Sequence, residues 1–234
     1  MSETTQHRTD EPDLEEIKRD KTTEELLHFS ILNIDKPSGP TSFRTAEIVK
    51  DVIGAKKMAH FGTLDPKVTG VLPVALNRAC KLTSWFLKKD KTYEGVMRVH
   101  KRITAEELQK EMDKFTGVIT QVPPVRSRVK RQPREREVYY WTLKDKTGKD
   151  VKFVSRVEAG TYIRKLIHDM GENIGGAHMR SLRRTEAGIF TADSDTFVTL
   201  KEFEKAANKY KEEGDDEDLR KLLIPGEAIG CLLP

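Results

Sequence analysis

The spacing of apolar and polar residues divides the chain into short helices and strands. Between a cap at Thr41 or Ser42 and a stop at Gly54, apolar residues recur every three to four positions, which predicts an amphipathic helix. Residues 71–76 form a continuous apolar run, which favours a buried strand, and residues 91–100 alternate as a half-exposed strand does. Helical and extended segments are therefore mixed from the start of the chain.

The same criteria predict the remaining elements. We expect helices over residues 23–28, 77–87 and 104–115 and from Thr161 and Thr199, and strands over 30–34, 58–61, 138–144, 150–157 and 177–185. Because these elements lack a regular βαβ order, the sequence predicts an α+β fold with a mainly antiparallel, mixed sheet flanked by helices. Residues 1–22 are polar and are expected to be flexible, and no linker divides residues 30–200.

Composition restricts the class of protein. The 234 residues carry two cysteines, Cys80 and Cys231, and neither lies at metal-ligand spacing from another Cys or His. We therefore expect no disulfide framework, no metal site and a reducing compartment. No apolar stretch reaches the length of a signal segment or a membrane span, so a cytoplasmic protein that does not bind membranes is predicted.

Charge is distributed unevenly. Residues 1–30 and 212–218 are acidic, whereas the centre is basic. The basic residues of the centre fall into two clusters, Arg126, Arg128, Lys130, Arg131, Arg134 and Arg136, and Arg180, Arg183 and Arg184. Such an arrangement favours a polyanionic partner, with an ordinary solvated surface as the alternative.

Asp65 is the main candidate for chemistry. It precedes Pro66 in a loop over residues 62–70, and Asp-Pro alone is typical of a turn. The loop, however, lies between two apolar segments that could hold it rigidly, as catalytic loops are held. A neighbouring arginine would keep the carboxylate ionised, and Arg164 is a plausible partner.

Tyr93 and Tyr162 each stand beside basic residues, an arrangement that suits base stacking, although a tyrosine of the core would look the same. His60 precedes Asp65 by a few residues and has no metal-ligand companions. A lone histidine of this kind is more often a structural or surface residue than a functional one.

Several runs resemble, in order, the motifs of the TruB-type pseudouridine synthases. They are residues 32–42, 60–70, 91–93, 158–164 and 181–185, and residues 67–70, 121–131 and 164–169 further resemble the dyskerin branch in its archaeal form. The resemblance covers roughly residues 22–200 and implies the pseudouridine synthase fold. It also implies an isomerase that converts uridine to pseudouridine in RNA without a cofactor or metal.

The resemblance assigns roles to individual residues. Asp65 would be the catalytic nucleophile, Tyr93 would stack on the base and take part in proton transfer, and Arg164 would pair with Asp65. The substrate would also meet a second set of side chains, His60, Tyr162, Leu182, Lys36 and Pro37. Lys36 and Pro37 would brace the Asp65 loop.

The resemblance leaves the substrate open. Position 55 of tRNA, ribosomal RNA selected by a box H/ACA guide RNA with small partner proteins, or both, are consistent with this branch. Residues 23–234 would form the catalytic domain, and we expect the C-terminal PUA domain of the branch to be missing. The alternative function is a non-catalytic RNA-binding or scaffold protein on the same fold.

Overall fold

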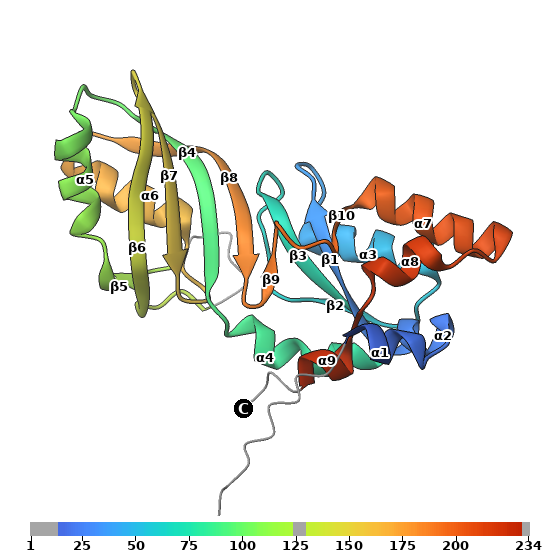
Figure 1. Cartoon of the computed structure of the whole chain (residues 1–234). Coiled ribbons are helices and arrows are strands. Elements are labelled where there is room, and N and C mark those ends of the chain that lie inside the picture. Colours follow the sequence, from blue (N-terminus) through green and yellow to red (C-terminus); the bar gives the residue numbers. More distant parts are fainter. Residues whose placement is uncertain (1–13, 124–129, 231–234) are drawn as a thin grey trace, which may run out of the picture.

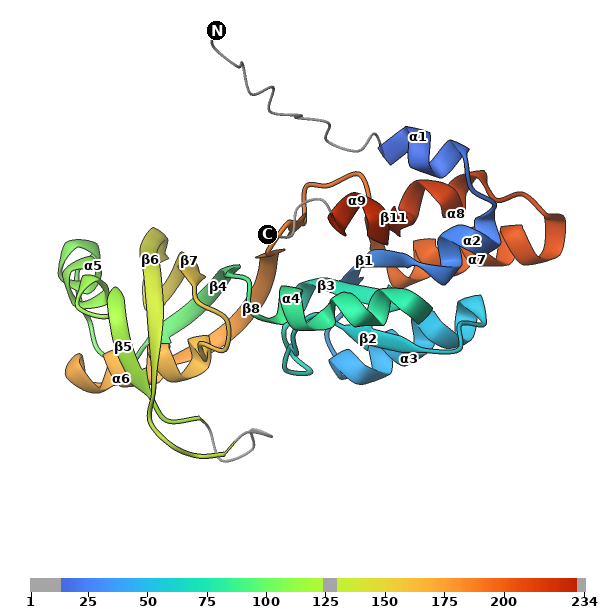
Figure 2. The same cartoon turned by 90° about the horizontal axis from the view of Figure 1, so that it is seen from below.

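The computed structural model describes residues 14–123 and 130–230, and a single mixed sheet runs through this part of the chain (Figures 1 and 2). The central strands follow the order β10-β1-β3-β8-β4-β7-β6-β5. Their bounds are β1 Ser30–Lys36, β3 Thr69–Leu76, β4 Lys91–Val99, β5 Gly117–Gln121, β6 Arg134–Thr147, β7 Asp150–Val157, β8 Ala177–Ala187 and β10 Phe197–Thr199. Short strands extend the sheet, β2 Met58–His60, β9 Phe190–Thr191 and β11 Ile224–Pro225.

Most strand pairs are antiparallel, and two are parallel. Strand β1 runs parallel to β10, and β3 runs parallel to β8 where Thr69 and Gly70 face Arg183 and Arg184. The β3–β8 contact joins the two halves of the sheet. An α+β fold with a mainly antiparallel, mixed sheet is therefore confirmed.

Helices cover the two ends of the sheet (Figure 1). Helices α5 (Ala105–Asp113) and α6 (Ile163–Asn173) lie by β4 to β8, whereas α2 (Thr23–His28), α3 (Ser42–Ile53), α7 (Leu200–Glu213) and α8 (Glu217–Leu222) lie by β1 and β3. Near the junction are α4 (Thr83–Leu87) and α9 (Gly226–Gly230), whereas η1 (Asn77–Leu82) packs against β1, β2, β3 and α2. Each end of the sheet has its own apolar core, one including Trp141, Phe153 and Met170, the other including Leu32, Val49 and Phe203.

Local sequence explains several boundaries. The Thr41 side chain accepts a hydrogen bond from the amide of Arg44 and so caps α3, and Gly54 ends that helix in a left-handed conformation. Thr104 with Glu107 and Thr199 with Glu202 form capping boxes at α5 and α7. These helix starts agree with the prediction.

Two details differ from prediction. Thr161 does not cap α6, because the cap position is Tyr162 and the Thr161 hydroxyl donates to the carbonyl of Glu158. Gly171 does not end α6 either, and the helix continues to Asn173. A Cβ on Gly171 would lie 2.4 Å from the amide nitrogen of Ala177, so the glycine allows close approach of β8 instead.

The predicted flexible segment over residues 1–22 falls largely outside the described residues. Its described end contains a short helix, α1 (Leu14–Arg19). None of the described helices is long and apolar enough to cross a membrane.

Candidate active site

Asp65 lies in the loop that connects β2 to β3, above the core of the β4–β8 half. Its neighbours Leu64 and Val68 are each 3 % exposed and pack in the same cluster as Tyr93 and Leu182. The Asp65 side chain itself is 49 % exposed. Burial of the flanking side chains thus fixes the loop while its carboxylate remains accessible.

Ser42 anchors this loop to helix α3. Its hydroxyl accepts a hydrogen bond of 2.8 Å from the amide of Leu64 and donates one of 3.0 Å to the carbonyl of the same residue. Because Thr41 takes the capping role, the Ser42 hydroxyl is available for this contact. Both backbone groups of the residue before Asp65 are therefore held by one side chain.

Lys36 supports the other side of the loop. The residue is fully buried, and its ammonium donates to the carbonyls of Pro37 at 2.8 Å, Pro66 at 3.0 Å and Val68 at 2.9 Å. Burial lowers the pKa of Lys36, while the negative charge of Asp65 acts in the opposite direction. The ammonium therefore ties the end of β1 to the backbone on both sides of Lys67.

Arg164 faces Asp65 from the first turn of α6. Its Nη2 lies 3.1 Å from Oδ2 of Asp65, and its side chain is 53 % exposed. An exposed pair of this kind adds little to the free energy of folding. Its consequence is local, because the guanidinium limits the orientation of the carboxylate.

Tyr93 and Leu182 come from adjacent strands and lie under the loop. Tyr93 of β4 faces Arg184 of β8, and Gly95 faces Leu182. A Cβ on Gly95 would lie 3.0 Å from Leu182 Cδ1 and 2.7 Å from the Ser181 carbonyl, so glycine permits this approach. The structure thus groups Tyr93 and Leu182 with the Asp65 loop.

The other predicted residues lie around this centre. His60 ends β2, where it pairs with Val74, and so approaches the loop from its N-terminal side. Tyr162 precedes α6, and its backbone exchanges hydrogen bonds with the side chain of Gln121 at 3.0 and 3.3 Å. Pro37 follows β1 and offers its carbonyl to Lys36. Their roles stay predictions.

Models of known protein families match two consecutive parts of the chain. The profile described as TruB family pseudouridylate synthase, N-terminal domain, matches residues 50–163, and that of the tRNA pseudouridylate synthase B C-terminal domain matches residues 164–229. A probable tRNA pseudouridine synthase B of Methanothermobacter thermautotrophicus is 41 % identical over 226 residues, covering 96 % of this chain and 69 % of that relative. The chain belongs to the TruB family.

Other TruB relatives are archaeal as well. A probable tRNA pseudouridine synthase B of Nanoarchaeum equitans is 44 % identical over 205 residues, covering 87 % of this chain and 58 % of the relative. The crystal structure of a Cbf5-Nop10-Gar1 complex superposes with a TM-score of 0.86 at 42 % identity, covering 90 % of this chain and 64 % of that one. The chain thus spans about three fifths of the length of these two relatives.

The comparison confirms a TruB-type pseudouridine synthase fold of the archaeal, Cbf5-like kind. In the part of the chain that the structure describes, no three His, Cys, Asp or Glu side chains are grouped as a metal site would require. The residues grouped around Asp65 supply a carboxylate, two cations, a hydroxyl and aromatic and aliphatic side chains.

Each arginine of the second basic cluster has partners within the chain. Arg180 pairs with Asp150 at 2.6 Å, and Arg183 pairs with Asp35 at 2.9 Å. Arg184 is only 1 % exposed. In the first cluster, Arg126 and Arg128 lie outside the described residues.

Two residues near Asp65 were not predicted to support its loop. The sequence presented Ser42 as a helix cap and Arg184 as part of a basic cluster, and each lies within a run that resembles a family motif. The alternation of Leu182 and Arg184 along β8 was the available signal, because it places both on one face of the strand.

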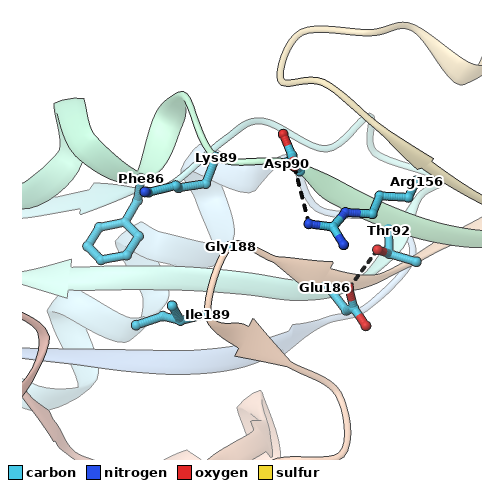
Figure 3. Close-up of a pocket in the computed structure, with 8 residues that line it drawn as sticks. All are labelled: Phe86, Lys89, Asp90, Thr92, Arg156, Glu186, Gly188 and Ile189. Carbon is cyan, nitrogen blue, oxygen red and sulfur yellow. Dashed lines mark hydrogen bonds and ion pairs between the residues drawn. The ribbon is translucent and has the colours of Figure 1, made fainter. Parts of the chain in front are cut away.

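A separate cavity of about 330 Å³ lies beside the turn from β8 to β9 (Figure 3). The residues that line it include Thr92 and none of the candidate active-site residues described above. Two charged side chains have partners within the wall: Arg156 contacts Asp90 at 3.3 Å, and Glu186 accepts a hydrogen bond of 2.6 Å from Thr92. The cavity is thus distinct from the Asp65 site.

Proposed function

We propose that residues 23–234 form the catalytic domain of an RNA pseudouridine synthase, an isomerase that converts specific uridines to pseudouridine. The observation that carries the proposal is the accessible Asp65 carboxylate, held on a braced loop and paired with Arg164 at 3.1 Å. Membership of the TruB family supports it independently.

The reaction is an intramolecular transfer. The bond between N1 of uracil and C1′ of ribose breaks, a bond between C5 and C1′ forms, a proton leaves C5, and N1 gains one. No electrons are exchanged with a second reactant. Asp65 acts as the nucleophile, as a carboxylate does in retaining glycosidases, and Arg164 orients it.

The target base must first leave its stack, at a cost of about a few kcal/mol. His60 occupies the vacated space in the RNA, and Tyr93 stacks on the flipped base and takes part in the proton transfer. Tyr162 and Leu182 line the space that the flipped base enters. Lys36 and Pro37 act indirectly, by holding the loop that carries Asp65.

For the substrate we propose position 55 of tRNA, guide-selected ribosomal RNA, or both, in the cytoplasm. The curated relatives support the first, since they are named probable tRNA pseudouridine synthase B. A similar chain in the structure of an H/ACA RNP bound to a substrate RNA containing 2′-deoxyuridine supports the second, with a TM-score of 0.82 at 39 % identity. In that case, guide RNA and small proteins such as Nop10 and Gar1 are the expected partners.

Asp65→Asn tests the chemistry. We expect the wild-type chain to release tritium from RNA containing [5-³H]uridine and the variant to release none, while both bind the RNA with similar affinity. Asn keeps the size of the side chain but removes its charge, so loss of activity alone would identify the carboxylate. Pseudouridine formation by purified Asp65→Asn would exclude the mechanism.

A second assay separates the substrates. The purified chain is incubated with unmodified tRNA transcript and with ribosomal RNA fragments, each with and without guide RNA and partner proteins. Activity on tRNA alone indicates a stand-alone enzyme, and activity that requires the guide indicates an H/ACA enzyme. If all combinations bind RNA but give no pseudouridine, the alternative of a non-catalytic RNA-binding scaffold is correct.

A further inference from the structure

Arg184 is an arginine buried inside the sheet, next to the candidate active site. It is 1 % exposed, and among the described residues no carboxylate lies within ion-pair distance of its guanidinium. Burying a charge without a counter-ion is costly unless its donors are satisfied. Burial accordingly lowers the pKa of Arg184, and a hydrogen bond with the Tyr93 side chain opposes that change.

The guanidinium of Arg184 donates hydrogen bonds to both ends of the Asp65 loop. Its Nε donates to the carbonyl of Val71 at 2.8 Å, and its Nη2 donates to the carbonyl of Gly62 at 3.1 Å. Gly62 begins the loop and Val71 follows its end, so one guanidinium spans both. The planar fork of arginine suits two acceptors in fixed directions, which an ammonium group does not match.

The backbone of Arg184 contacts the same loop. Gly70 pairs with Arg184 in the parallel β3–β8 ladder. A Cβ at Gly70 would lie 2.1 Å from the Arg184 carbonyl oxygen, and a Cβ at Gly62 would lie 3.3 Å from its Nη1. Both loop ends therefore approach this residue as closely as glycine allows.

On its other side, Arg184 faces Tyr93. The two residues are partners in the β4–β8 ladder, and a register shift between Thr92 and Tyr93 adjusts their alignment. Arg184 thus contacts both the loop bearing Asp65 and the side chain of Tyr93.

We propose that Arg184 is a positioning residue that holds the Asp65 loop and Tyr93 at a fixed separation. It does not touch the substrate; it fixes the two groups that do. The expected effect on rate rests on the proposed function, whereas the expected effect on the loop does not.

The test compares Arg184→Lys and Arg184→Met with wild type and with Arg98→Lys. Lysine keeps the charge without the fork, and methionine fills similar volume without charge if a buried ammonium prevents folding. Arg98 is a matched control, because it lies on β4 and pairs with Asp150 at 3.0 Å on the surface. Two quantities are measured, amide hydrogen exchange of peptides covering residues 60–70 and the single-turnover rate on RNA.

In the Arg184 variants, exchange over residues 60–70 should accelerate by about 10- to 100-fold, the factor for losing one charge-assisted hydrogen bond. Peptides from α3 and α7 should exchange as in wild type. The single-turnover rate should fall by about 10- to 100-fold while RNA affinity changes less than about twofold. Arg98→Lys should match wild type in all three measurements.

Three outcomes would overturn the proposal: unchanged exchange in residues 60–70, acceleration spread equally over the whole chain, or failure of both variants to fold. The last two would make Arg184 a residue of the fold alone. If the wild-type chain formed no pseudouridine, the proposed function would fail, yet the exchange result would still decide whether Arg184 fixes the loop.

Discussion

Asp65 Oδ2 lies 3.1 Å from Arg164 Nη2, a contact that joins the β2–β3 loop to the first turn of α6. Both side chains are about half exposed, so solvent screens the pair and its contribution to folding is small. What the pair controls is the direction of one carboxylate oxygen. Activity should therefore respond to its loss far more than stability does.

Arg164→Met tests whether the ion pair affects activity more than stability. We expect the single-turnover rate to fall by about 100-fold or more, because the carboxylate loses its oriented partner, while the thermal midpoint stays near that of wild type. Arg44→Met is the control, since Arg44 is 58 % exposed and forms a comparable pair with Glu47 on α3. Wild-type activity in Arg164→Met would remove the ion pair from the mechanism.

Ser42→Ala should affect both stability and rate. It leaves the buried amide and carbonyl of Leu64 without their partner, which should cost about 1–3 kcal/mol of unfolding free energy in urea titrations. The rate should fall because the loop gains freedom. Thr41→Ala removes only the helix cap, so it should lose about 1 kcal/mol and keep its rate; equal rates in the two variants would contradict a loop role for Ser42.

The sequence predicted the elements whose signals are local. Helix α3 has its cap and its terminal glycine in place, and β3 is a continuous apolar run. Strand β5 was not predicted: its residues are mostly exposed, and its conformation depends on pairing with β6. Such short edge strands are defined by distant partners rather than by their own composition.

The candidate site likewise contains some residues that the sequence predicts and others that it does not. Asp65 could be found from its motif, and Arg164 from the need for a counter-ion. Arg184 lies within the motif over residues 181–185, but its contact with the loop could not be predicted, because a buried guanidinium looks like a surface charge in sequence until the register of β8 against β3 and β4 is known. The presence of a charged residue in a predicted strand does not reveal which face of the strand its side chain occupies.

Gly70→Ala tests the close approach of the loop to β8. Gly70 has φ +99°, and an added Cβ would lie 2.1 Å from the Arg184 carbonyl, so strain and a backbone clash combine. We expect a loss above about 2 kcal/mol in urea unfolding. Gly148→Ala has φ +60° with open space around it, and should lose only about 1 kcal/mol. Equal losses in the two variants would show that the clash is relieved without cost.

Lys91 should make stability depend on pH above neutrality. It is 5 % exposed, and burial, with a further contribution from the positive charge of Arg184, lowers its pKa to about 8. Its ammonium donates to the carbonyls of Phe86 and Leu87 at the end of α4. In the unfolded chain a lysine titrates near 10.4, so between these values the unfolded state binds more protons than the folded state.

The sign follows from that difference. Stability attributable to Lys91 rises as pH increases from about 8 towards 10, so the unfolding free energy of wild type relative to Lys91→Met should increase by about 2 kcal/mol between pH 7 and 9.5. Urea titrations at several pH values measure it. Lys88→Met, which removes an exposed lysine from the same segment, is the control. If the unfolding free energies of Lys91→Met and Lys88→Met, each relative to wild type, changed with pH in the same way, burial would not destabilise the Lys91 ammonium.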